Sequence, residues 1–211
     1  MAEERRAVKE RQRVIVGVSG ASGIVYAART LEFLRSLDVE THLIVSRSAE
    51  LMRSCESALS RKDLAQLADV VHPINDVAAS ISSGSFMTLG MVIAPCSMRS
   101  LAEIATGVTG SLLTRAADVV LKERRRLVLM VRETPLTLIH LRNMAAVTEA
   151  GGIIFPPVPA FYMRPTTIDE LVDHSVGRAL DQLGLHVDTF PRWNEEFRGK
   201  QLTGKPDSSD E

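Results

Sequence analysis

The sequence predicts an α/β fold of three layers, in which a parallel sheet lies between helices on both faces. Two observations carry this prediction. Short runs of β-branched and other apolar residues, typical of strands buried on both sides, alternate along the chain with stretches of helical periodicity. The chain has 211 residues, is 45% hydrophobic and shows no internal repeat, which is enough for one domain with a substantial core.

The first strand, turn and helix lie between residues 14 and 37. Residues 14–18 form an apolar run, Gly17, Gly20 and Gly23 open a turn, and residues 24–37 have helical spacing. The turn matches neither the dinucleotide fingerprint nor a P-loop. Backbone N–H groups at a helix start nevertheless attract anions, so we expect a phosphate-bearing ligand here rather than a turn whose serines only cap the helix.

The later elements follow the same rhythm. We expect strands at residues 42–45, 70–71, 91–94, 127–131 and 153–155. We expect helices that begin near Ala49 and Leu101, and others at residues 62–68, 111–121, 136–150 and 168–183. The helix near Ala49 should bury Leu51, Cys55 and Leu59, whereas the polar loop at residues 80–87 is too rich in small residues to build core.

Polar side chains follow several of these strands. Ser46 comes after the second strand, residues 97–100 come after the fourth, and Arg132 and Glu133 come after the fifth. The carboxyl ends of parallel strands meet at one edge, where ligands of open α/β sheets bind. Cys96 has no histidine nearby in sequence, so we interpret it as part of a packed wall rather than a nucleophile. By spacing alone, Glu56 is a solvated helical carboxylate.

Composition excludes several classes of function. The net charge of -1 gives no indication of a nucleic acid or an anionic membrane as partner, and no apolar run is long enough for a membrane span. Two cysteines and five scattered histidines predict neither a disulfide framework nor a metal site, which favours a reducing cytoplasm. We expect a disordered, charged arm without a signal peptide at residues 1–13, one domain at 14–193, and a polar tail at 194–211.

Eight short motifs give the chain a family resemblance. They are G-A-S-G (20–23), A-P-C-S-M (94–98), A-T-G (105–107), R-A-A-D-V-V-L-K-E-R-R (115–125), R-E-T-P (132–135), I-H-L-R-N-M (139–144), P-x-P-A-F-Y (157–162) and F-P-R-W (190–193). Each is weak alone. In this order on this βα rhythm, they make residues 14–193 resemble the flavin prenyltransferases, the UbiX-type accessory proteins of aromatic-acid decarboxylases.

This resemblance implies an activity, a fold and an assembly. Family members transfer a dimethylallyl group from dimethylallyl phosphate to N5 and C6 of reduced FMN, without a metal. The product, prenylated FMN, serves a partner decarboxylase of the UbiD type. The implied fold is a Rossmann-like, flavodoxin-like parallel sheet with helices on both faces, and the implied assembly is a homo-oligomer, a dodecamer with sites between subunits.

The resemblance also implies roles for individual residues. The implied flavin contacts are Gly20, Ala21, Ser22, Ser46, Ser97, Met98, Arg99, Ser100 and Arg132. The implied contacts to the phosphate of the donor substrate are Arg115, Lys122, Tyr162 and Arg178. The implied catalytic residues are Ser22 beside flavin N5, Glu56 as proton relay at C6, Glu133 for proton traffic with phosphate, and Trp193, whose π face steadies an allyl cation.

Two other functions share parts of this pattern. A flavin-dependent cysteinyl decarboxylase has the same fold and FMN, but its P-A-S-A-N-T-like and P-x-M-N-x-x-M-W-like segments are replaced here by A-P-C-S-M-R-S and P-P-V-P-A-F-Y. A non-catalytic FMN-carrying subunit of an aryl-acid decarboxylase needs no second phosphate site, which the cations Arg115, Lys122 and Arg178 indicate. The sequence leaves open which decarboxylase and pathway are served, and whether the donor is a monophosphate or a diphosphate.

Overall fold

The sheet of this protein has six parallel strands. A computed structural model describes residues 11–194, so residues 1–10 of the arm expected at 1–13 and residues 195–211 of the tail expected at 194–211 lie outside the described residues. The strands are β1 (Arg13–Val18), β2 (Glu40–Val45), β3 (Val70–His72), β4 (Gly90–Cys96), β5 (Arg126–Val131) and β6 (Ile153–Ile154). Their order is β3-β2-β1-β4-β5-β6, which is the Rossmann order and places the switch point between β1 and β4.

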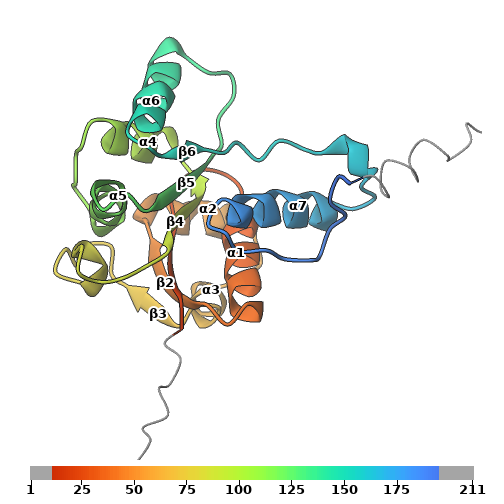
Figure 1. Cartoon of the computed structure of the whole chain (residues 1–211), viewed down its shortest axis with the longest axis horizontal. Helices are drawn as coiled ribbons and strands as arrows, with labels where there is room; N and C mark the ends of the chain where they lie inside the picture. The colour runs from red at the N-terminus through yellow and green to blue at the C-terminus, as the bar shows by residue number, and fades with distance from the viewer. Residues whose placement is uncertain (1–10, 195–211) are drawn as a thin grey trace, which may run out of the picture.

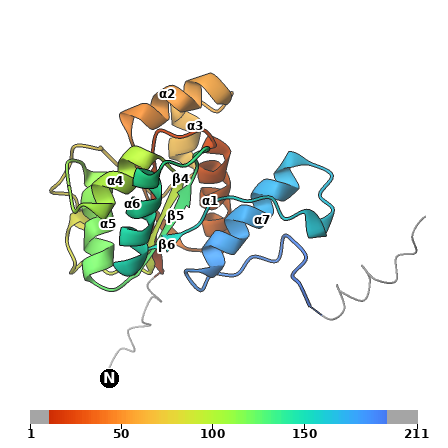
Figure 2. The same ribbon diagram turned by 90° about the horizontal axis from the view of Figure 1, so that it is seen from above.

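Helices cover both faces of the sheet, which confirms the predicted three layers (Figures 1 and 2). On the first face lie α1 (Ile24–Ser36) and α7 (Ile168–Asp181). On the second face lie α4 (Met98–Ala105), α5 (Leu112–Lys122) and α6 (Leu138–Glu149). Alternate residues of each strand enter the two cores; Val14 and Val16 pack on the first face and Ile15 on the second. This double burial is the reason why the strands are continuous apolar runs.

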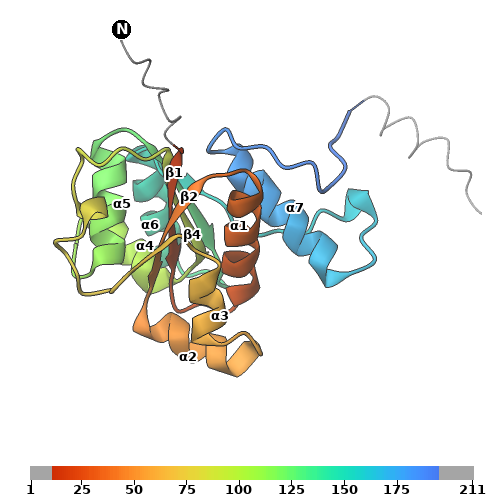
Figure 3. The ribbon, with the colours of Figure 1, turned by 90° about the horizontal axis from the view of Figure 1, so that it is seen from below.

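Two short helices follow β2, α2 (Arg47–Glu56) and α3 (Arg61–Gln66). Helix α2 lies beyond the carboxyl ends of the strands (Figure 3), whereas α3 buries Leu64 in the first-face core. The buried face expected for α2 is wrong, because Leu51 is 69% exposed and Cys55 is exposed. Ala49 is the buried residue of α2. A helix at the edge of a sheet has no core to cover, so α2 is free to present side chains to a site.

The polar loop between β3 and β4 does contribute to the core, contrary to expectation. Its 3-10 turn η1 (Ser80–Ser82) inserts Ile81, which is 1% exposed, into the second-face core. The guanidinium of Arg125 donates hydrogen bonds to the carbonyls of Phe86 (2.7 Å) and Gly84 (2.6 Å), which anchors the loop. The buried isoleucine and the two hydrogen bonds from Arg125 together hold this segment against the second face.

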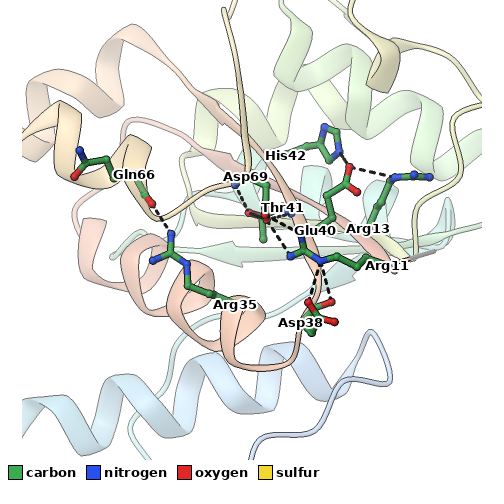
Figure 4. A network of polar contacts seen from close by, with 9 residues as sticks. All are labelled: Arg11, Arg13, Arg35, Asp38, Glu40, Thr41, His42, Gln66 and Asp69. Atoms are coloured by element: carbon green, nitrogen blue, oxygen red, sulfur yellow. Dashed lines mark hydrogen bonds and ion pairs between the residues drawn. The ribbon is translucent and has the colours of Figure 1, made fainter. Parts of the chain in front are cut away.

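The amino edge of the sheet is held by a polar network, shown in Figure 4. Arg11 Nη1 donates to Asp69 Oδ1 at 2.9 Å, and Asp69 Oδ2 accepts from the backbone N–H of Thr41 at 2.8 Å. The first strand begins at Arg13, one residue before the expected boundary. No helix within residues 11–194 combines the length and the apolar character that crossing a bilayer requires.

Candidate functional site

The turn after β1 holds a carboxylate from α2. Glu56 Oε2 accepts a hydrogen bond from Ser22 Oγ at 2.7 Å, and Glu56 Oε1 accepts from the backbone N–H groups of Gly23 and Ile24, each at 2.7 Å. The anion at the N–H groups of Gly23 and Ile24 is thus a protein side chain, whereas Gly20, earlier in the same turn, lines a cavity described below. Glu56 is exposed, as its spacing indicates, but its carboxylate is tied to Ser22 and to the turn rather than left without a protein partner.

The electrostatics of this contact keep Glu56 ionised. Burial alone would raise its pKa, but hydrogen bonds from Ile24, Ser22 and Gly23 and the charge of Arg132 outweigh burial and leave the pKa below its ordinary value. Arg132 follows β5, so its charge reaches the turn after β1 across the switch point. The arrangement is an ionised carboxylate and a serine hydroxyl beside a cation.

Tyr26 belongs to the same neighbourhood, and the sequence analysis missed it. Its ring lies where a side chain at Gly23 would project, 2.8 Å from an added Cβ. Burial raises the pKa of Tyr26, while the charge of Arg132 acts in the opposite direction. A tyrosine one turn into a helix has no sequence signal that separates it from an ordinary packing residue.

A cavity of about 300 Å³ lies beside this turn at the carboxyl edge of the sheet. Three helices begin at its wall, with Ser46 as N-cap of α2, Ser97 of α4 and Ser111 of α5. Each serine hydroxyl accepts a hydrogen bond from its own helix at 3.1 to 3.4 Å. Three helix dipoles that point at one cavity favour a dianion there. The starts of α2, α4 and α5 therefore offer a place for the predicted phosphate beside the turn.

The cavity collects most of the expected flavin contacts. Gly20, Ser46, Ser97, Arg99 and Ser100 all line it. Ala21 and Ser22 continue the turn from Gly20 towards Glu56, and Met98 packs partly buried against the second-face core. The hydroxyl groups, the arginine and the helix starts fit the phosphate of a mononucleotide.

Two further residues near this edge were assigned from the sequence. Cys96 is fully buried, and burial raises the pKa of its thiol to about 12, which confirms the packed-wall interpretation. Glu133 is exposed beyond β5, and its Oε1 accepts from the backbone N–H of Thr134 at 3.0 Å. It remains open to solvent next to Arg132.

The cations expected for the donor phosphate lie on opposite faces of the sheet. Arg115 and Lys122 are on α5, and Arg178 is on α7. Each is ion-paired with an acid on its own helix or beside it: Arg115 with Asp118 at 2.8 Å, Lys122 with Glu123, and Arg178 with Asp181 at 2.8 Å. The sheet separates these two groups within one chain (Figure 3).

Tyr162 and Trp193 lie together, although Tyr162 precedes α7 and Trp193 follows it. Their rings are 5.5 Å apart edge to face, and the Tyr162 hydroxyl lies 3.1 Å from His174 Nε2 of α7. Tyr162 is carried by the 3-10 turn η2 (Phe161–Met163). Asp181, whose side chain is 7% exposed, accepts from both Nη atoms of Arg192 at 2.7 and 2.9 Å.

Asp181 and His174 contact these candidate residues, and the sequence analysis did not single them out. The Asp181 carboxylate pairs with Arg178 and with Arg192, which precedes Trp193 in the chain. His174 forms a hydrogen bond with the Tyr162 hydroxyl. His174 and Asp181 are both on α7, and their spacing is that of any amphipathic helix.

A Rossmann-order sheet whose carboxyl edge carries an anion cavity formed by helix starts defines a mononucleotide-binding α/β protein. Comparisons with known proteins identify the family to which the chain belongs. Residues 2–180 match the sequence profile of the flavoprotein family. A flavin prenyltransferase UbiX from Neisseria meningitidis is 58% identical over 182 residues, which cover 86% of this chain and 96% of that protein.

Solved structures agree with this match. The crystal structure of AnUbiX (PadA1) in complex with FMN and dimethylallyl pyrophosphate has a TM-score of 0.87 and 52% identity, covering 88% of this chain and 98% of that one. A dodecameric FMN-dependent UbiX-like decarboxylase from Escherichia coli O157:H7 has a TM-score of 0.85 and 48% identity, covering 87% and 100%. The chain belongs to the UbiX flavin prenyltransferases of the flavoprotein family.

Proposed function

We propose that this protein transfers a dimethylallyl group from dimethylallyl phosphate to N5 and C6 of reduced FMN and releases prenylated FMN. The observation that carries the proposal is the contact of Ser22 with ionised Glu56, beside Arg132 and next to an anion cavity. When bound, reduced FMN supplies the nucleophilic positions. The residues of the chain bind and orient the two substrates, and they move protons.

The cavity holds the flavin phosphate in this proposal. The starts of α2, α4 and α5 and the hydroxyls of Ser46, Ser97 and Ser100 face one dianion without a metal. Gly20 lets the turn lie close against α2 at the wall of the cavity, because a Cβ there would lie 2.3 Å from Ser48 Cβ. From this anchor the turn at Ala21 and Ser22 leads to Glu56, and Arg132 adds a positive charge.

Glu56 is the proton acceptor when a proton leaves C6. A group with a lowered pKa is ionised at neutral pH and is ready to accept, and its three hydrogen bonds fix its orientation. Ser22 can pass a proton because its hydroxyl both donates and accepts. Glu133 is proposed to exchange a proton with the departing phosphate, and the π face of Trp193 to stabilise positive charge on the allyl group.

Arg115, Lys122, Tyr162 and Arg178 are proposed to bind the donor phosphate and stabilise its developing charge. All are exposed or only partly buried in the single chain, so one chain does not exclude water from this reaction. The same surfaces carry exposed apolar side chains, among them Ile139 at 67%, Phe161 at 73% and Ile168 at 77%. We propose that copies of the chain cover these surfaces in a dodecamer and complete each site between subunits.

The product is proposed to serve a UbiD-type decarboxylase in the cytoplasm. Two free cysteines among the described residues, one exposed, suit a reducing compartment. The alternatives are a cysteinyl decarboxylase and a non-catalytic FMN carrier, and neither accounts for the cations of α5 and α7.

One experiment separates these functions. The protein is mixed anaerobically with reduced FMN and dimethylallyl phosphate, and the flavin is weighed by mass spectrometry. A flavin heavier by one prenyl group is expected. Unchanged flavin with turnover of a cysteinyl peptide would instead identify a decarboxylase, and unchanged flavin without either turnover would identify a carrier. Ser22→Ala serves as the variant in which slow formation of the adduct is expected.

A further inference from the structure

The flavin-phosphate cavity is lined by three charged residues among those that the structure describes, Arg47, Arg99 and Glu103. Two of them form a pair, because Arg99 Nε donates to Glu103 Oε1 at 2.9 Å along α4. Their charges cancel at this wall. If Arg99 turned to a phosphate instead, Glu103 would remain as a negative charge beside it, so Arg99 adds little net attraction for a dianion.

Arg47, the first residue of α2, differs from Arg99 in having no acid as partner. Glu50 lies three residues further along the same helix, where it could pair with Arg47. Its carboxylate is already engaged, because it accepts from Arg53 Nε at 3.1 Å and lies 3.5 Å from Arg61 Nε. Across residues 11–194, Arg47 makes no ion pair, so its charge is not matched within the described chain.

The position of Arg47 suits a ligand at this cavity. The residue is exposed, and it lines both the flavin-phosphate cavity and a neighbouring cavity of about 380 Å³, so it lies in the wall between the two spaces. No side-chain hydrogen bond fixes it within the described part of the chain. A guanidinium in this situation can turn to an anion without breaking an ion pair, and its planar donors match two oxygens of a phosphate.

We propose that Arg47 supplies the charge that binds the flavin phosphate and makes the site specific for FMN over riboflavin, the same flavin without a phosphate. The inference rests on the proposed function, which puts the flavin phosphate in this cavity. The starts of α2, α4 and α5 contribute partial positive charges, and Arg47 adds a full one. Arg99 serves mainly to neutralise Glu103.

Fluorescence titration of the full-length protein with FMN and with riboflavin tests the role of Arg47. The unsubstituted protein is expected to bind FMN more tightly than riboflavin. Arg47→Gln is expected to weaken FMN binding at least about tenfold, through loss of a charge-assisted contact, and to leave riboflavin binding unchanged. The control is Lys62→Gln, which removes one positive charge from an exposed residue of α3 outside the cavity lining and should change neither affinity.

Two further variants test the balance of charges at the cavity. Glu103→Gln releases Arg99 and removes a negative charge, so FMN should bind about threefold more tightly, with riboflavin binding unchanged. In the double variant Arg47→Gln/Glu103→Gln, the released Arg99 should restore part of the FMN affinity that Arg47→Gln loses.

The outcomes separate this inference from the proposed function. If the unsubstituted protein prefers FMN and Arg47→Gln keeps that preference, the assignment of Arg47 is wrong and the phosphate cavity stands. If the unsubstituted protein binds FMN and riboflavin equally, the phosphate cavity itself is refuted, and the role of Arg47 with it. An equal loss of FMN and riboflavin binding in Arg47→Gln would also overturn the inference, because it would show that Arg47 does not act on the phosphate.

Discussion

Substitution of Glu56 by glutamine should separate its role as a proton acceptor from its role as a cap of α1. The carboxylate accepts three hydrogen bonds of 2.7 Å each. A glutamine amide has nearly the same shape; its oxygen can accept from Gly23 and Ile24, and its NH₂ group can donate to Ser22 Oγ. All three contacts survive in neutral form. What is lost is the negative charge near the start of the helix, which at an exposed position is worth about 0.5–1 kcal/mol.

The effect on the reaction should be much larger than the effect on stability. Removal of a general base slows proton transfer by about 100-fold to 10,000-fold. We therefore expect Glu56→Gln to form the flavin adduct at least about 100-fold more slowly while its melting temperature falls by only about 2–4 °C. The measurement is a single-turnover reaction under anaerobic conditions, quenched and followed by mass spectrometry.

A control on α1 has the same chemical change away from the site. Glu32 pairs with Arg29, and Glu32→Gln should retain the rate of the unsubstituted protein. A Glu56→Gln rate within about threefold of that control would refute the assignment of Glu56 as proton acceptor. A large loss of stability would instead show that the charge of Glu56 mainly holds the turn.

Three further predictions concern the cavity, the α7 segment and pH. Gly20→Ala should weaken FMN binding about tenfold or more in a fluorescence titration, since its Cβ would meet Ser48 at 2.3 Å; Gly110→Ala, at the same cavity but with nothing within 4 Å of the added Cβ, should bind normally. Asp181→Asn should lower the free energy of unfolding in urea by about 2–4 kcal/mol, because the buried carboxylate pairs with Arg192 and Arg178, whereas Asp118→Asn at an exposed pair should cost less than about 1 kcal/mol. The free energy of unfolding should fall as pH drops from 7.5 through the unfolded-state histidine pKa of about 6.5. Burial lowers the pKa of His72 and His174 in the folded protein, so the unfolded chain binds more protons in this range. A His174→Gln variant with an equally steep decline would contradict this.

The sequence predicts the layers of this fold well and the edge of the sheet poorly. The composition of residues 14–18 suits a strand buried on both sides, and the structure places its residues alternately in the two cores. The pattern of Leu51 and Cys55 was misleading because a helix at the edge of a sheet has the same local spacing as one across its face. Ile81 was missed because one buried side chain in a polar loop has no periodicity.

The candidate site shows the same division. Serines that follow strands are found from sequence, since a parallel sheet brings strand ends to one edge, and Ser46 and Ser97 do line the cavity. Glu56 is 34 residues from Ser22, and no local rule predicts their hydrogen bond. Only the family resemblance overturned its interpretation as a solvated carboxylate. Asp181 and His174 have neither a local signal nor a place in the motifs, and only the structure shows that they contact Arg178 and Tyr162.

The division of the cations between two faces follows from the topology and bears on how the reaction can occur. Helix α5 connects β4 to β5 on the second face, whereas α7 returns to the first face after β6 and packs on α1. A sheet filled with apolar side chains on both sides lies between Arg115 and Arg178, so no movement of side chains brings both to one phosphate. If cations from α5 and α7 bind one phosphate, they must therefore come from different copies of the chain. Burial of the exposed apolar side chains on α6 and η2 would favour the association of such copies.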